Sequence, residues 1–122
     1  MMSKVSPELP FSEKRPWGEF RQFTDGEAVT VKTIFVQRGE SFSLQDHQAR
    51  SEFWRVLSGT PEITVGRAIV RAKKGDEFSV PIGVEHRVRA LDDDVELLEI
   101  SRGQFDEQDI VRLEDKYGRA GN

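Results

Sequence analysis

The chain has 122 residues, of which 36% are hydrophobic and 33% are charged. This length predicts one domain, with a core large enough to fold without disulfides or a structural metal. Because the chain contains no cysteine, we exclude disulfides, thiolate zinc clusters, iron–sulfur sites and thiol nucleophiles. Any bound metal must therefore use nitrogen and oxygen ligands.

The formal net charge is −4, and the 18 basic residues are scattered along the chain. A nucleic-acid binder concentrates its positive charge on one face, so we expect no nucleic-acid partner. No apolar run reaches the length of a signal-peptide core or a membrane span. We therefore expect a cytoplasmic protein with no membrane partner.

The N-terminal segment, residues 1–28, differs in composition from the rest. Pro7, Pro10 and Pro16 favour an extended backbone, and Trp17 is one of several apolar anchors in the segment. We expect an arm packed along the barrel that residues 29–122 form, on its own subunit or on a partner.

From Val29 onward, short β-prone runs are broken by turn residues at intervals of about ten, which is typical of an all-β sandwich or barrel. The connections are too short for crossover helices, so the sheets should be antiparallel. A helical turn is predicted at Asp106–Asp109, before the polar tail. The predicted strands are Ala28–Gln37, Glu52–Leu57, Pro61–Val65, Ala68–Ala72, Glu77–Val80, His86–Leu91 and Val95–Ser101. We expect the larger aromatic residues to pack in the core, namely Trp17, Phe35, Phe42, Trp54 and Phe78.

The two histidines, His47 and His86, are the main candidates for chemistry. Alternate residues of a strand share a face, so Gln45 and His47 should point the same way, and a turn at Arg50-Ser51 would bring Glu52 beside them. Two imidazoles and a carboxylate suit a divalent transition metal, and Gln45 could add an amide oxygen. The alternative is that each histidine only packs at a half-buried position with a hydrogen-bond partner.

The glycine spacing favours the first of these readings. Gly39, seven intervening residues, His47, then Glu52 and Gly59 resemble the first cupin motif. Gly75, five intervening residues and the run from Pro81 to His86 resemble the second. The resemblance implies a cupin double-stranded β-helix, a jelly-roll barrel of about six to eight strands.

A closer resemblance covers most of the chain. It is to the cupin domain of type II mannose-6-phosphate isomerases, which is usually fused behind a mannose-1-phosphate guanylyltransferase domain. The chain has no phosphate-cradling glycine loop, so the resemblance concerns the isomerase part alone. The matching segments are Arg15–Gly18, Val31–Ile34, Ser43–His47, Arg50–Trp54, Leu57–Thr60, Gly103–Phe105 and Asp109–Arg119.

The resemblance implies metal-assisted interconversion of mannose 6-phosphate and fructose 6-phosphate, with zinc as the expected ion. A set of Gln45, His47, Glu52 and His86 would be similar in composition to the zinc site of type I phosphomannose isomerases. Matches to the family pattern place Arg50 and Lys32 around the enediol and the phosphate. Without a metal, Glu52 would be the catalytic base and His86 its partner acid.

Three departures from the family pattern leave other functions open. Ala49 and Phe53 stand where members of the family usually carry histidine, and Ala90 replaces an asparagine of the second motif. The alternatives are a sugar-binding or regulatory cupin without catalysis, and another small-molecule cupin enzyme such as an oxygenase or a sugar-nucleotide isomerase. We also expect a homodimer, formed through the N-terminal arm and an outer strand.

Overall fold

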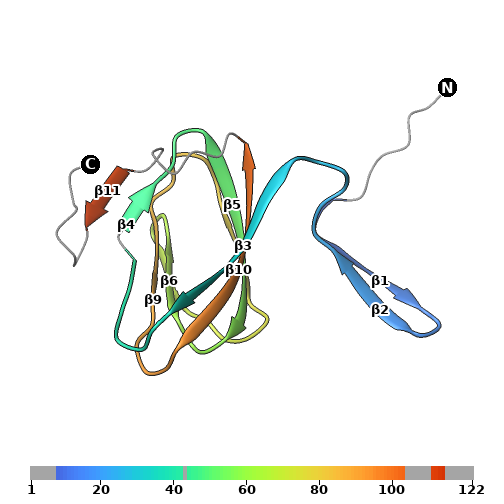
Figure 1. Cartoon of the computed structure of the whole chain (residues 1–122), viewed down its shortest axis with the longest axis horizontal. Coiled ribbons are helices and arrows are strands. Elements are labelled where there is room, and N and C mark those ends of the chain that lie inside the picture. Colours follow the sequence, from blue (N-terminus) through green and yellow to red (C-terminus); the bar gives the residue numbers. More distant parts are fainter. Residues whose placement is uncertain (1–7, 43, 104–110, 115–122) are drawn as a thin grey trace.

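The computed structural model describes residues 8–42, 44–103 and 111–114. All regular structure in these ranges is β, in antiparallel pairs (Figure 1). No helix among the described residues has the length and apolar character needed to cross a membrane. The strands are β1 (Phe11–Arg15), β2 (Gly18–Gln22), β3 (Val29–Val36), β4 (Leu44–Asp46), β5 (Arg50–Ser58), β6 (Glu62–Val65), β7 (Ala68–Arg71), β8 (Glu77–Val80), β9 (His86–Arg89), β10 (Val95–Gly103) and β11 (Val111–Glu114).

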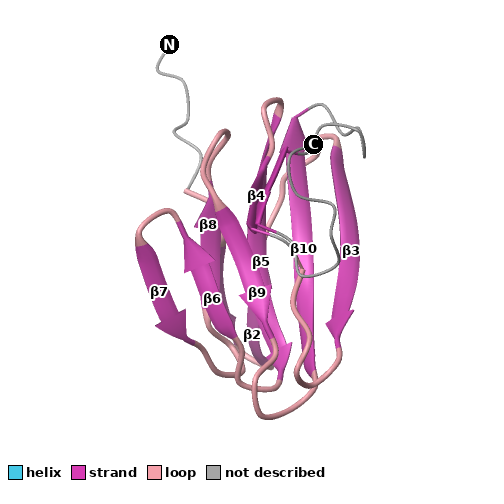
Figure 2. Cartoon of the chain, turned by 90° about the vertical axis from the view of Figure 1, so that its left-hand side faces the viewer, coloured by secondary structure: helices cyan, strands magenta, loops and turns pink. Residues whose placement is uncertain are grey.

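Two of the sheets form the barrel. One has the strand order β3-β10-β5-β8, and the other has the order β11-β4-β9-β6-β7 (Figure 2). Alternate residues of each strand point inward, as in β5, where Trp54 and Val56 are fully buried. These side chains meet Ile63 and Val88 from the opposite sheet in one hydrophobic core. The predicted all-β antiparallel fold is confirmed.

One motif glycine shows why the turn sequence matters. Gly59 directly follows β5 and has a φ of +83°, and a Cβ atom there would lie 2.2 Å from the carbonyl oxygen of Asp94. Only glycine combines that backbone conformation with so close an approach. Glycine at position 59 therefore allows the chain to turn from β5 toward β6 in close contact with the loop that precedes β10.

The N-terminal segment contains a β-hairpin, β1 and β2, which lies to one side of the barrel in Figure 1. Arg21 on β2 contacts Glu77 on the barrel through a pair of hydrogen bonds, and the ring of Phe23 packs on that of Phe53. The segment predicted to form an extended arm thus contains two paired strands between Phe11 and Gln22. The helical turn predicted at Asp106–Asp109 lies outside the described residues.

Two sequence expectations are wrong in detail. Trp17 at the hairpin turn and Phe35 on β3 are 72% and 59% exposed, so they are not core residues. Trp17 lies in the turn between β1 and β2, and Phe35 lies on the outer face of β3, whereas Trp54 faces inward. The turn before Glu52 is at Gln48-Ala49 rather than Arg50-Ser51, because pairing with β10 extends β5 back to Arg50.

Candidate metal site

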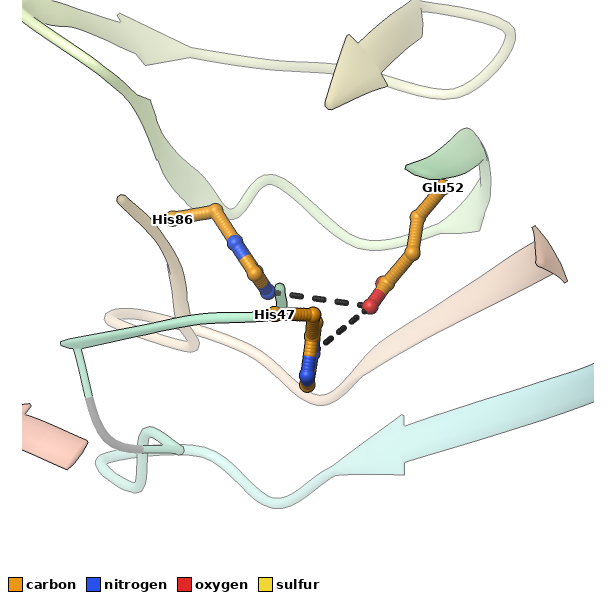
Figure 3. Close-up of side chains that lie close together, drawn as sticks. All are labelled: His47, Glu52 and His86. Carbon is orange, nitrogen blue, oxygen red and sulfur yellow. Dashed lines mark ion pairs between the residues drawn. The ribbon is translucent and has the colours of Figure 1, made fainter. Parts of the chain in front are cut away.

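The two histidines and Glu52 come together from both barrel sheets. Glu52 lies on β5, His86 begins β9, and His47 directly follows β4. The amide of Gly83 donates a 2.8 Å hydrogen bond to the carbonyl oxygen of His47, which joins the two histidine-bearing loops. Figure 3 shows the three side chains pointing toward one another.

Their ligand atoms lie within 4.8 Å of one another, and all three residues are buried. Oε1 of Glu52 is 2.8 Å from Nε2 of His47 and 3.8 Å from Nε2 of His86. One carboxylate oxygen therefore faces both imidazoles, an arrangement that can hold a metal ion.

The surroundings of His86 fit this role. Its Nδ1 lies 3.0 Å from the carbonyl oxygen of Val84, so the proton resides on Nδ1 and leaves a lone pair on Nε2. Nε2 has no hydrogen-bond partner among the described residues, although it is buried. A divalent ion between this nitrogen and the carboxylate would accept the Nε2 lone pair and so provide the partner that the buried atom lacks.

A second carboxyl group, Glu99 on β10, lies behind Glu52 and was not among the predicted site residues. The indole Nε1 of Trp54 lies 3.2 Å from Oε2 of Glu52 and 3.1 Å from Oε2 of Glu99, so it can donate to both. This contact leaves Oε1 of Glu52 for the histidines. Lys32 lies on the other side of Glu99, with Nζ 3.8 Å from its Oε1.

These contacts separate the pKa values of the two carboxyl groups. Burial opposes ionisation of Glu52, but hydrogen bonds from His47 and Glu99 and the nearby histidines hold its pKa well below the usual value. Burial, together with the neighbouring Glu52 carboxylate, raises the pKa of Glu99 to about 8. Burial lowers the pKa of His86. The pocket thus contains one carboxylate and one carboxylic acid at neutral pH.

The raised pKa of Glu99 predicts how the stability of the metal-free protein depends on pH. The unfolded chain loses the Glu99 proton near pH 4.5 and the folded chain loses it near pH 8. The contribution of Glu99 to the free energy of unfolding therefore decreases as the pH rises from 4.5 to 8. Below pH 6.5 the lowered pKa of His86 acts in the opposite direction. Between pH 6.5 and 8 we expect a loss of up to about 1.4 kcal/mol per pH unit, relative to Glu99→Gln. Denaturant unfolding of the wild type and of Glu99→Gln, at several pH values with a chelator present, measures this difference. If the free energies of unfolding of the two proteins changed in parallel with pH, the prediction would be wrong.

The other predicted site residues line the same cavity. Lys32, Gln45 and Arg50 surround a space of about 100 Å³ together with His47, Glu52 and Glu99. Nη2 of Arg50 lies 3.2 Å from Nε2 of His47, and Nε of Arg50 lies 3.5 Å from Oε1 of Glu52. Gln45 pairs with His86 across β4 and β9. A groove of about 470 Å³ adjoins the cavity and shares Ile34 and Phe42 with it.

The positions that depart from the family pattern differ in their geometry. Phe53 neighbours Glu52 on β5, so its side chain leaves the opposite face of the sheet, where it packs on Phe23. A histidine at position 53 would therefore point away from the metal site. Ala49 lies in the bend between His47 and β5 and is half-buried.

Comparison with known proteins places the chain by sequence. Residues 8–115 match the model of a protein family described as mannose-6-phosphate isomerase, C-terminal. The xanthan biosynthesis protein XanB of Xanthomonas campestris pv. campestris is 40% identical over 107 residues, which cover 86% of this chain and 23% of that protein. The mannose-1-phosphate guanylyltransferase ManC of Salmonella typhimurium is 35% identical over 107 residues, covering 86% and 22%. The chain thus spans less than a quarter of the length of these relatives.

Solved structures show the same fold at lower identity. The DMSP lyase DddQ from Ruegeria pomeroyi has a TM-score of 0.63 and 24% identity, over 75% of this chain and 45% of that one. The cupin domain of Schizosaccharomyces pombe Cnp3 has a TM-score of 0.59 and 19% identity, over 67% and 61% of the two chains. These similarities show that the barrel has the cupin fold.

Proposed function

Because the chain belongs to the mannose-6-phosphate isomerase C-terminal family, we propose that it interconverts mannose 6-phosphate and fructose 6-phosphate with a divalent metal ion. The observation that carries this proposal is the buried group of His47, Glu52 and His86, which adjoins a cavity whose lining includes Lys32 and Arg50. A cytoplasmic location, where sugar phosphates are made and used, belongs to the same proposal.

The metal would be held by His47, Glu52 and His86, with Gln45 as the proposed fourth ligand from the same cavity wall. Two imidazoles and hard oxygen donors suit zinc, which is the ion we propose. When bound, such an ion polarises the carbonyl of the open-chain sugar and the neighbouring hydroxyl.

Lys32 and Arg50 supply the fixed positive charge of the cavity. Arg50 is 5% exposed and lies against His47 and Glu52, whereas Lys32 stands farther out on β3. We assign Arg50 to the oxygens of the enediol, because a rigid guanidinium beside the ligands meets the charge that develops there. Lys32 is then placed to bind the phosphate.

The isomerisation needs a group that moves a proton between two carbon atoms. The proton on carbon 2 of the aldose must reach carbon 1, while the proton of the carbon 2 hydroxyl moves to the carbon 1 oxygen. With Glu52 held as a ligand, Glu99 is the cavity carboxyl that can take the first of these protons and return it. Its pKa of about 8 belongs to the metal-free pocket; a cation held by Glu52 and the histidines would favour the ionised form of Glu99, which is the form that accepts a proton.

The alanine at position 49 favours a second candidate, a cupin that binds a sugar phosphate without converting it. One ligand fewer than the family pattern weakens a metal site, and a barrel can keep its pocket after losing catalysis.

One experiment separates these functions. The full chain is stripped with a chelator, reloaded with Zn²⁺, Co²⁺ or Mn²⁺, and supplied with mannose 6-phosphate while fructose 6-phosphate is measured. We expect one metal ion per chain and turnover by the loaded protein only. Binding of the sugar phosphate without conversion would instead identify the binding module, and oxygen uptake by an iron-loaded chain would identify an oxygenase.

A further inference from the structure

Strand β3 is an edge strand of its sheet, and no other strand that the structure describes pairs with its outer edge. Figure 2 shows it at the margin of the barrel. The register of the ladders determines which backbone groups face that edge. On β5, the N–H of Val56 donates to the carbonyl oxygen of Asp76, and the carbonyl oxygen of Val56 accepts from the N–H of Gly75. Both groups of Val56 therefore face the side of the sheet on which β8 lies. Since successive residues of a strand direct their backbone groups to opposite sides, the paired residues Lys32 and Glu99 bond between β3 and β10.

The odd-numbered residues Val31, Thr33 and Phe35 therefore direct their N–H and C=O groups away from the sheet. Their side chains lie on its outer face, where Val31 is 56% and Phe35 is 59% exposed. Native sheets protect an exposed edge with charges, proline or a short strand. The outer face of β3 has neither a charge nor a proline, although the strand is eight residues long.

The other edge strands in the described part of the chain differ from β3. β7 also carries exposed apolar residues, Ile69 and Val70, but it has only four residues; it ends on Arg71, and Arg67 directly precedes it. β8 has four residues, and Glu77 at its start is paired with two arginines. Short, charged edges of this kind resist pairing with another chain. The fourth edge strand of the barrel sheets, β11, also has only four residues. Among the barrel edge strands that the structure describes, β3 alone combines length, an apolar outer face and unpaired backbone groups.

We propose that β3 pairs antiparallel with β3 of a second copy of this chain, about a two-fold axis at Thr33. This register places Val31 of each copy opposite Phe35 of the other on the outer face, an apolar pair at both ends of the contact. It sets Lys32 opposite Ile34 on the inner face. A register centred on Lys32 would instead oppose two like charges. The central register is thus self-complementary in hydrogen bonding, apolar contact and charge, as a two-fold interface must be.

The pairing also affects access to the metal site. The adjoining groove is lined by the consecutive residues 34–37 and by Glu40, Ser41 and Phe42. Consecutive residues of a strand point to opposite faces, so the groove runs along the edge of β3. The second copy would lie along that groove, and substrate would reach the cavity between the two subunits.

The mass of the protein in solution tests the dimer independently of metal or turnover. The single chain has a mass of 13.9 kDa, and light scattering after size exclusion should give twice that value. Phe35→Lys places a charge at both ends of the contact and should raise the dimer dissociation constant about 100-fold or more. Ile69→Lys, on the other exposed edge, is the matched control and should leave the dimer intact. A monomeric wild type, or a dimer unaffected by Phe35→Lys, would overturn the proposal.

Cross-linking tests the register, because the chain has no cysteine of its own. Thr33→Cys places two thiols opposite each other at the axis, within reach of a disulfide or a short bis-thiol reagent. We expect a covalent dimer of Thr33→Cys under mild oxidation, and none of Val70→Cys on β7. Equal cross-linking of the two variants, or none of Thr33→Cys, would overturn the register.

Discussion

Glu52→Gln is expected to lower isomerase activity at least about 1,000-fold and metal affinity about 100-fold or more. The carboxylate contributes the oxygen that faces both histidines, at 2.8 Å and 3.8 Å. A neutral amide keeps the size of the side chain and can still accept a hydrogen bond from Trp54, but it removes the negative charge. Calorimetry with Zn²⁺ and the conversion of mannose 6-phosphate measure the two effects.

Two further variants make this result specific. Gln45→Ala should weaken metal binding less, by about tenfold, since one neutral ligand is lost while the charged one remains. Glu77→Gln removes a carboxylate from the outside of the same sheet, where it pairs with Arg21 and Arg55, and should leave metal binding unchanged. If Glu52→Gln bound zinc as tightly as the wild type, the assignment of the His47–Glu52–His86 group as the metal site would be wrong.

Glu99→Gln is expected to lower kcat by about 100- to 10,000-fold and to change metal affinity only a few-fold. Glutamine can keep the contacts with Trp54 and Ser101 but cannot carry the proton between the two carbon atoms. Solvent isotope incorporation adds a direct readout, because the proton that Glu99 carries should exchange with water before it returns to the sugar. The variant should lose this exchange together with turnover.

A positioning role for Glu99 would give a different pattern. If Glu99 only held Glu52 in place, its substitution would weaken metal binding and turnover together, and Glu99→Asp would not restore either. Because Glu99 contacts Glu52 and also lies beside Lys32, zinc affinity and turnover must both be measured on Glu99→Gln. Retained zinc affinity with lost turnover supports proton transfer; parallel losses contradict it.

Trp54 illustrates how the fold and the site depend on one residue. Its ring is fully buried in the core, and its indole N–H reaches both carboxyl groups. The apolar packing that stabilises the barrel thus also orients Glu52, whose other carboxylate oxygen faces the two histidines. Restraints of this kind around a ligand commonly account for much of the affinity of a metal site.

The sequence by itself determined the β architecture, because short β-prone runs between turn residues leave no room for helices. Through the resemblance to the cupin motifs it also predicted that His47, Glu52 and His86 belong to one site, and these residues do lie together in the structure. The alternation of residues along β10 could have indicated Glu99, because it shares the inward face of that strand with Val95 and Leu97. The alternation does not, however, show which residues of other strands lie beside Glu99.

Only the tertiary structure decided which groups meet. Trp54, Glu52 and Glu99 lie close together because β5 and β10 pair in one register, and a shift of one residue would turn Glu99 to the outside. The position of β3 at the sheet edge is likewise a matter of strand order, which local pattern does not contain. Local periodicity determines the faces of a strand; pairing between distant strands determines what those faces contact.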